Sequence, residues 1–227
     1  MNIIFEDKEI MVVNKPAGQL SQSGKDLSLD LVSEVLNTRR ERGEQCEAFI
    51  INRLDRPVSG LVLIAKTKQA AARYSKLLQS EGGFNKQYMA LVCGKPDASE
   101  GELVNYLVHD KKNNLSYVTD DLPDKNEAKK VVKNDSKNEA KLARLRYELV
   151  SYDEEKDVSL VRIHLLTGRH HQIRVQFSNI GCPIVGDGKY SNGIDVNRDA
   201  RFDGRKIALC AAALSCGGRE FKVDAPF

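Results

Sequence analysis

The sequence predicts a single α+β domain over residues 1–227, and three observations support this fold class. A chain of 227 residues with 41% hydrophobic content is long enough to bury one sizeable core. Helix-like and strand-like apolar spacings both occur, and from Leu103 onward the pattern is mostly strand-like. Neither an internal repeat nor a linker divides the chain.

In the first half of the chain, the expected elements alternate between strand and helix. The run from Leu61 to Ala65 is continuously apolar, which predicts a central strand. Thr67 stands where its hydroxyl can cap the following helix, and Gly82 and Gly83 are expected to end that helix. The expected strands cover residues 3–5, 10–13, 61–65 and 87–92, and the expected helices cover residues 30–42 and 69–78.

The second half is expected to add further strands and one helix. Residues 167–180 have the pattern of a loop entering a helix, which would point Ile173, Phe177 and Ile180 inward. The polar stretch 119–138 lacks periodicity and is expected to be a mobile insertion. The expected strands cover residues 105–109, 115–118, 144–152 and 159–165.

The amino-acid composition limits the class of protein and the kind of partner that we expect. The formal net charge is only +3, so any attraction to a polyanionic partner would have to come from how the 35 Lys and Arg residues are arranged. Residues 39–42 and 125–146 are locally basic, although a solvated face with interspersed acids explains each equally well. No apolar run approaches the roughly 20 residues that span a bilayer, so we expect a soluble protein. The five cysteines show no zinc or disulfide spacing, so we expect them to lie in the core of a cytoplasmic protein. A single compact domain makes a monomer the expected state.

One carboxylate is a candidate for chemistry. Asp55 lies between Arg53 and Arg56, and Pro57 and Gly60 break regular structure around it, which predicts a turn whose side chain can face a cleft. A neighbouring guanidinium favours the ionised form and lowers an aspartate pKa by roughly one to three units. We therefore expect an ionised, oriented carboxylate. On these residues alone, a surface ion pair is the alternative.

Four ordered blocks of the sequence match one family. The stretch from Asn52 to Lys66, N-R-L-D-R-P-V-S-G-L-V-L-I-A-K, resembles the signature H-R-L-D-x-x-T-S-G-L-L-L-x-A-K of the RluA-type pseudouridine synthases. Residues 166–175 and 180–187 resemble the T-G-R-T-H-Q-I-R-V-H and H-P-I-x-G-D motifs of that family. Two shorter pieces, residues 6–18 and 86–94, follow the same order.

The resemblance implies a mixed, mostly antiparallel central sheet with helices and loops around a basic cleft. It implies an enzyme that isomerises uridine to pseudouridine in structured RNA, ribosomal or transfer, with no cofactor, no metal and no obligate protein partner. Asp55 would be the nucleophile or base, Arg174 its partner, and Tyr88 the ring against the flipped uracil, with a hydroxyl suited to moving the carbon-five proton. The side chains expected to contact RNA or shape its cleft are Arg53, Lys15, Arg169 and Gln172.

The chain also departs from the family pattern. Asn52, Val58 and His170 stand where His, Thr and Thr are usual, and the chain is expected to lack the S4-like N-terminal domain that many relatives carry. Adjacent His170 and His171 would point about 100° apart on a helix and so cannot share a metal. The alternative function is a non-catalytic RNA-binding or ribosome-assembly protein that uses the same cleft.

Overall fold

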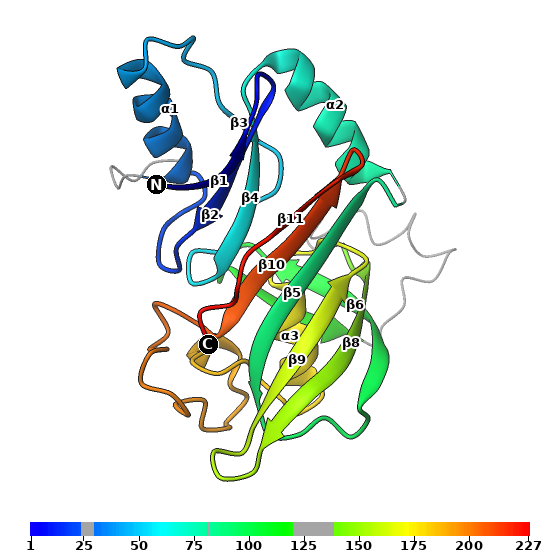
Figure 1. Cartoon of the computed structure of the whole chain (residues 1–227). Coiled ribbons are helices and arrows are strands. Elements are labelled where there is room, and N and C mark those ends of the chain that lie inside the picture. The colour runs from blue at the N-terminus through cyan, green and yellow to red at the C-terminus, as the bar shows by residue number, and fades with distance from the viewer. Residues whose placement is uncertain (24–29, 81, 120–138) are drawn as a thin grey trace, which may run out of the picture.

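The computed structural model describes residues 1–23, 30–80, 82–119 and 139–227. Three helices, α1 (Leu31–Glu41), α2 (Lys68–Gln79) and α3 (Gln172–Asn179), and the short 3-10 helix η2 (Gly188–Tyr190) lie in this part of the chain. The strands, drawn in Figure 1, are β1 (Asn2–Glu6), β2 (Ile10–Lys15), β3 (Phe49–Ile50), β4 (Ser59–Ala65), β5 (Phe84–Cys93), β6 (Glu100–Asp110), β7 (Leu115–Thr119), β8 (Lys141–Asp153), β9 (Val158–Leu165), β10 (Leu209–Cys216) and β11 (Arg219–Lys222).

All these strands form one sheet. Its order is β1-β2-β4-β10-β5-β9-β8-β6-β7, with β3 beside β4 and β11 beside β10. Of the strand pairs within the described residues, only β4 and β10 run parallel. The predicted α+β fold with a mixed, mostly antiparallel sheet is therefore confirmed.

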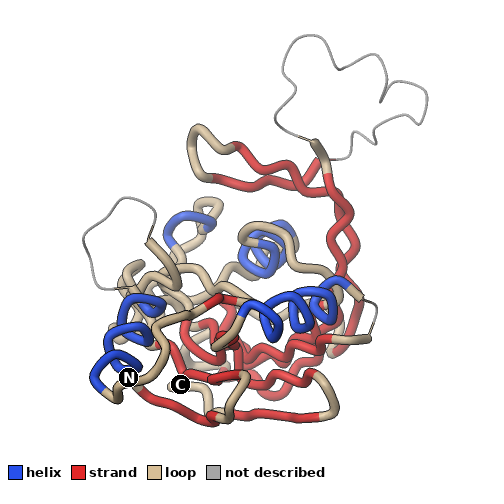
Figure 2. The backbone as a smooth tube through the Cα atoms, turned by 90° about the horizontal axis from the view of Figure 1, so that it is seen from above, coloured by secondary structure: helices blue, strands red, loops and turns tan. Residues whose placement is uncertain are grey.

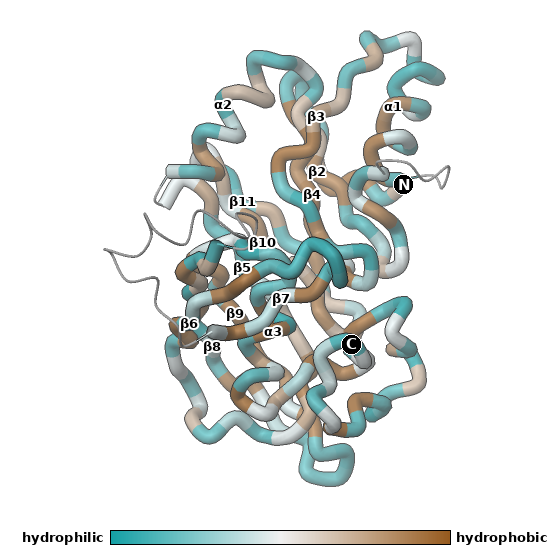
Figure 3. Tube along the Cα trace, turned by 180° about the vertical axis from the view of Figure 1, so that it is seen from behind, coloured by the Kyte–Doolittle hydropathy of each residue, from teal (hydrophilic) through white to brown (hydrophobic). Residues whose placement is uncertain are grey.

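The central strand β4 is buried on both faces and separates two hydrophobic cores. Val62 and Ile64 belong to the core that α1 and α3 cover, whereas Leu61 and Leu63 belong to the core that α2 covers. Successive side chains on a strand point to opposite faces, so a strand between two packed layers needs a continuous apolar run. Figure 3 shows such hydrophobic segments along β2 and β4. The predicted central strand is thus confirmed.

Two helices begin at side-chain caps. Asp30 accepts a hydrogen bond from the Ser33 amide at 2.7 Å at the start of α1, and Thr67 accepts one from the Ala70 amide at 3.1 Å at the start of α2. The predicted cap at Thr67 is therefore confirmed. Within the described residues, every helix is too short or too polar to cross a membrane.

Strands β6, β7 and β8 extend the sheet beyond β9 and turn toward α3. In Figure 2 the β6–β7 hairpin arches on the same side as this helix. Leu107 of β6, Ala143 of β8, Val175 of α3 and Tyr190 of η2 form a small core of their own. This packing brings the hairpin close to the chain segment that the second sequence block occupies.

The structure differs from three expectations, and a fourth concerns residues outside the described part of the chain. Strands β10 and β11 were not expected, yet β10 lies at the centre of the sheet between β4 and β5. Ile180 is 38% exposed instead of pointing inward, because α3 ends at Asn179 before it. Cys46 is exposed, while the other four cysteines are buried as expected. The predicted mobile insertion falls, apart from Thr119, outside the described residues.

The parallel pair β4–β10 depends on a glycine. Gly60 has φ +115° and lies opposite Ala211 of β10. A Cβ at this position would lie 2.5 Å from the Ala211 nitrogen and 2.8 Å from its carbonyl carbon. Real Cβ atoms do not approach backbone so closely, so only glycine lets the two strands meet.

Gly60→Ala should therefore lower the free energy of unfolding by about 2–5 kcal/mol, since it combines an unfavourable φ with overpacking against β10. Gly43→Ala is the matched control. Gly43 also has a positive φ, +70°, but no atom lies within 4 Å of a Cβ built there. Urea unfolding of the two variants measures the difference, and equal losses would show that the close approach to Ala211 has no energetic weight.

Candidate active site

The loop that carries Asp55 joins β3 to β4 and is held by buried groups. The hydroxyl of Ser21 accepts a hydrogen bond from the Leu54 amide at 3.0 Å and donates one to the Leu54 carbonyl at 2.7 Å. The Val58 amide donates to the Asp55 carbonyl at 3.1 Å and closes a turn. Leu54 and Val58 are both buried in the main core. The backbone at Asp55 is thus fixed, while its side chain remains 30% exposed.

Asn52 ties the start of this loop to β4. Its Nδ2 donates to the Leu61 carbonyl at 3.1 Å and its Oδ1 accepts from the Leu63 amide at 2.8 Å. An amide carries a donor and an acceptor, so it satisfies both backbone groups at once. At this departure from the family pattern, the side chain therefore supports the loop backbone.

Lys15, expected to contact RNA or to shape its cleft, is fully buried. Its Nζ donates to the carbonyls of Pro16 at 3.0 Å, Gln19 at 2.8 Å and Arg56 at 3.4 Å. Burial lowers the pKa of Lys15 to about 8, and the charge of Asp55 opposes this shift. A side chain with 0% exposure cannot reach RNA in this conformation. Lys15 instead joins the β2 loop to the Asp55 loop.

Arg174 of α3 links Asp55 to a second carboxylate, Asp187. One guanidinium nitrogen, Nη1, lies 3.1 Å from Oδ2 of Asp55. Nε and Nη2 contact Oδ2 and Oδ1 of Asp187 at 2.6 and 2.8 Å. Arg174 is 5% exposed and Asp187 only 1%. The bidentate pair with Asp187 fixes the plane of the guanidinium and so fixes where Nη1 holds Asp55.

The ring of Tyr190 lies under this cation, with its centroid 4.9 Å from Cζ of Arg174. Burial by itself lowers the pKa of Arg174, but the hydrogen bonds and charges of Asp187 and Asp55 raise it on balance. Arg174 therefore stays a cation. The sequence analysis named Arg174 as a site residue but neither Asp187 nor Tyr190. Asp187 ends the family-like block 180–187, and its place in that motif was the signal that could have identified it.

The ionisation of Asp55 differs from the expectation. Burial raises the pKa of Asp55 above its ordinary value, and although Arg174 and Lys15 lower it, the net shift is upward. The expected lowering by arginine is therefore real but smaller than the desolvation of the carboxylate. A carboxylate that is both anchored and poorly solvated is a stronger base than an exposed one.

Tyr88 lies on β5 between Ala211 of β10 and Ile163 of β9. It is 7% exposed and packs in the same core cluster as Leu54. Burial, reinforced by the charge of Asp55, raises the pKa of Tyr88 above its ordinary range. Its hydroxyl is therefore a neutral phenol close enough to feel the Asp55 charge.

His170 and His171 do not diverge as expected. They precede α3, with His171 in a left-handed conformation at φ 53°, and their rings stack with centroids 3.7 Å apart. His109 of β6 stacks on the other face of His170, also at 3.7 Å. Burial lowers the pKa of His170 to about 4 and that of His171 to about 2, so both rings are neutral. Nowhere in the described residues do three His, Cys, Asp or Glu side chains gather to hold a metal ion.

The remaining predicted RNA-binding residues fall into two groups. Arg53 and Arg169 are exposed, and Arg53 lies near enough to His170 to contribute to its lowered pKa. Gln172, expected to contact RNA or to shape its cleft, is only 3% exposed. Its side chain accepts from Thr167 Oγ1 at 2.8 Å and donates to the Arg144 carbonyl at 3.0 Å, which pins α3 to β8.

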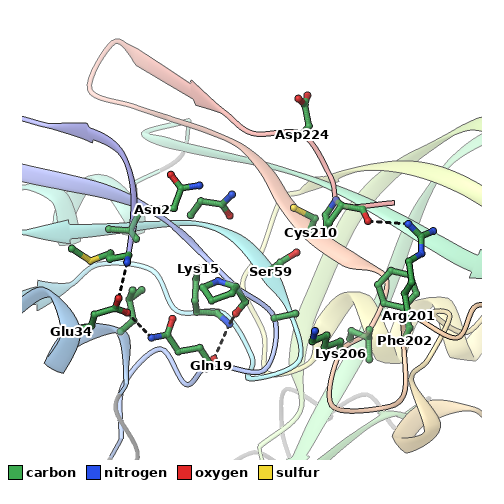
Figure 4. A pocket seen from close by; sticks show the side chains of 18 residues that line it. Asn2, Lys15, Gln19, Glu34, Ser59, Arg201, Phe202, Lys206, Cys210 and Asp224 are labelled. Carbon is green, nitrogen blue, oxygen red and sulfur yellow. Dashed lines mark hydrogen bonds and ion pairs between the residues drawn. The ribbon is translucent and has the colours of Figure 1, made fainter.

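A hollow of about 680 Å³ lies beside β2 (Figure 4). Lys15 and Ser59 line it, together with Arg201 and Lys206 of the segment before β10. Asp55, Tyr88 and Arg174 are not among its lining residues. It is thus separate from the cluster that the sequence singled out.

Asp187→Asn should lower the free energy of unfolding by about 3–5 kcal/mol, because it removes the buried, bidentate carboxylate partner of Arg174 and leaves the guanidinium only its single contact with the part-exposed Asp55. Asp199→Asn is the matched control. Asp199 also binds an arginine, Arg201, at 2.6 Å, but that arginine is 59% exposed, and exposed pairs contribute only about 0–1 kcal/mol. Equal losses in thermal unfolding would contradict the importance of the buried pair.

Comparisons with known proteins identify the family of this chain. The sequence profile of the family described as RNA pseudouridylate synthase matches residues 9–179. The dual-specificity RNA pseudouridine synthase RluA of Escherichia coli (strain K12) is 34% identical over 194 residues, which cover 84% of this chain and 77% of that protein. The ribosomal large subunit pseudouridine synthase C of Rickettsia bellii (strain RML369-C) is 33% identical over 192 residues.

The chain spans little more than half, 56%, of the length of that Rickettsia protein. Among solved structures, human RNA pseudouridylate synthase domain containing 4 superposes with a TM-score of 0.74 at 23% identity, over 99% of this chain and 88% of that one, and shows the same fold. The profile match and the identity to RluA together show that this chain belongs to the RluA-type family of RNA pseudouridylate synthases.

Proposed function

We propose that this protein isomerises uridine to pseudouridine in structured RNA and that Asp55 is the reacting group. The observation that carries the proposal is the Asp55 carboxyl, which Arg174 holds at 3.1 Å while nearly a third of the side chain stays open to a substrate. Tyr88, whose pKa responds to the charge of Asp55, is the second candidate and carries both a ring and a hydroxyl. These are the groups that a cofactor-independent rearrangement of a base requires.

The reaction breaks the glycosidic bond between ribose and N1 of uracil, turns the base and joins the ribose to carbon five. The proton leaves carbon five and N1 gains one, so atoms and charge balance without a redox step. A carboxylate acts here as nucleophile or base at the sugar or ring. The raised pKa of Asp55 increases its basicity while Arg174 keeps its direction.

Tyr88 contributes as a neutral phenol. Its ring gives the displaced uracil a flat surface, an interaction worth about 1–3 kcal/mol per base. Because burial keeps its proton bound, the hydroxyl works by donating and accepting hydrogen bonds near carbon five and not as a tyrosinate.

Exposed Lys and Arg side chains around the site would bind the RNA. Arg53 lies two residues before Asp55, and Arg56, Arg169 and Lys189 are likewise exposed. A guanidinium that enters the space left by an extruded base, or binds its phosphate, offsets the few kcal/mol of unstacking. The relatives that carry ribosomal large subunit in their names support ribosomal RNA as a substrate class, and transfer RNA is the second class to test.

Asp55→Asn should bind RNA as the wild type does and form no pseudouridine. The variant is expected to fold, because Asp187 still neutralises Arg174 through two contacts. Tritium release from uridine labelled at carbon five measures the reaction, and filter binding measures affinity. Persistent release would remove Asp55 from the chemistry, whereas binding without any release by the wild type would favour a non-catalytic RNA-binding protein.

Tyr88→Phe should retain RNA binding and slow product formation by roughly 10²–10⁴-fold if its hydroxyl assists proton transfer. Since the pKa of Tyr88 lies above its ordinary value of 10.0, the wild-type rate should show no loss from Tyr88 ionisation below that pH. A single-turnover rate equal to that of the wild type would leave Tyr88 with stacking alone.

A further inference from the structure

His171 is the N-cap residue of α3, but its backbone conformation is unfavourable and its side chain does not cap the helix. It is the N-cap of α3, where Ser, Thr, Asp or Asn usually accept from the helix amides, yet its side chain makes no capping hydrogen bond. Its φ of 53° is left-handed, a conformation that a histidine adopts only when its surroundings enforce it. The ring is turned instead toward Asp55, with Nε2 3.5 Å from Oδ2.

The neighbours of the two ring nitrogens favour one tautomer of His171. The Ser116 amide donates to the Tyr190 hydroxyl at 2.9 Å, and the same hydroxyl lies 2.6 Å from Nδ1 of His171. A phenol oxygen has two lone pairs and one proton, so it can either donate to Nδ1 or accept from it. Nε2, however, faces Oδ2 of Asp55, and an ionised carboxylate can only accept. A neutral imidazole that donates from Nε2 accepts at Nδ1, so Tyr190 donates to Nδ1.

Both groups that approach the Asp55 carboxyl reach the same oxygen. Arg174 Nη1 lies 3.1 Å and His171 Nε2 3.5 Å from Oδ2. Among the described residues, the side-chain hydrogen bond to this carboxylate ends on Oδ2, and none ends on Oδ1. Oδ1 is thus the less constrained oxygen of the carboxylate.

We propose that His171 is a positioning residue, whose Nε2–H is set by Tyr190 and holds Oδ2 of Asp55 together with Arg174, so that Oδ1 is the oxygen presented to uridine. The kinetic part of this inference rests on the proposed function. The contact of 3.5 Å is longer than a good hydrogen bond and tightens when substrate is bound, as catalytic contacts commonly do.

The stacked rings keep the His171 imidazole in plane. His170 is sandwiched between His171 and His109, and its Nδ1 lies 2.9 Å from the Ser116 hydroxyl. Ser116 therefore contacts His170 through its hydroxyl and Tyr190 through its backbone amide. The departure of His170 from the family pattern thus places a flat ring where it supports His171.

The charge of Asp55 responds to several groups besides His171. Those that face it or influence its pKa are Arg174 and Lys15, which lower it, and Asp187, which raises it. Tyr88 and Tyr190 feel its charge as neutral phenols. None of these groups changes when His171 is replaced, so a shift in the acid limb of activity reports on the His171 contact.

The first test needs no RNA. Nitrogen-15 NMR of the imidazoles in the free protein should show His171 with its proton on Nε2 and an accepting Nδ1. Tyr190→Phe keeps the ring under Arg174 but removes the donor, so the Nδ1 resonance should move and the second tautomer should become populated. A wild-type spectrum with the proton on Nδ1 would overturn the proposal, whatever the enzyme's activity.

The second test separates the N–H from the ring. His171→Phe keeps the stack but loses the donor, and its single-turnover rate should fall by on the order of 10²-fold with unchanged RNA affinity. The acid limb should move to higher pH, because a donor that favours the ionised carboxylate is gone. His171→Gln, whose amide N–H reaches about as far as Nε2, should recover part of the rate.

Tyr190→Phe added to His171→Phe should cause no further loss, since Tyr190 acts through His171. The control is His164→Phe on β9, which should match the wild type. Wild-type activity with an unaltered rate and acid limb in His171→Phe would refute the positioning role. An inactive wild type would refute the proposed function instead, and the NMR result would still decide the tautomer.

Discussion

The buried guanidinium of Arg174 is the interaction on which the site depends. It is shared between Asp187, which it binds through two nitrogens, and Asp55, which it reaches with a third. A buried cation needs a buried anion, and Asp187 supplies it. Asp55 is therefore free to differ from an ordinary ion-pair partner: it receives direction from the arginine without being needed to neutralise it. This division of labour explains how a carboxylate can be both anchored and reactive.

The sheet brings these groups together from distant parts of the chain. Asp55 precedes β4, Tyr88 lies on β5, and Arg174 lies in the first turn of α3. Between β4 and β5 runs β10, whose small residues accept the close approach of Gly60. A bulkier strand there would push the Asp55 loop away from Tyr88. The alanine-rich β10 is thus part of how the site is built, although it carries no reacting group itself.

Burial keeps the two histidines neutral and keeps the proton on Tyr88. Burial also lowers the pKa of Arg174, but its hydrogen bonds with Asp187 and Asp55 raise that pKa on balance and keep the cation. The pKa of Asp55 is set by two opposed influences, desolvation and the charge of Arg174. Because desolvation opposes the arginine, its basicity exceeds that of a surface aspartate.

The sequence by itself determined the fold class and most of the strands and helices. Its resemblance to a known family predicted Asp55, Tyr88 and Arg174 as site residues, and the structure joins Asp55 to Arg174. Apolar periodicity and caps such as Thr67 are local signals. The short motif around Asp55 is also local, so it can be recognised without knowing which residues lie near it in space. β10 escaped notice because alanine and cysteine have little strand preference and only its place between two strands makes it one. Tertiary structure alone decided that Lys15 and Gln172 are internal braces, that Asp187 completes Arg174, and that His171 turns toward Asp55. Each of these depends on contacts between residues far apart in the chain, and neither burial nor the direction of a hydrogen bond across such a distance is written in local sequence.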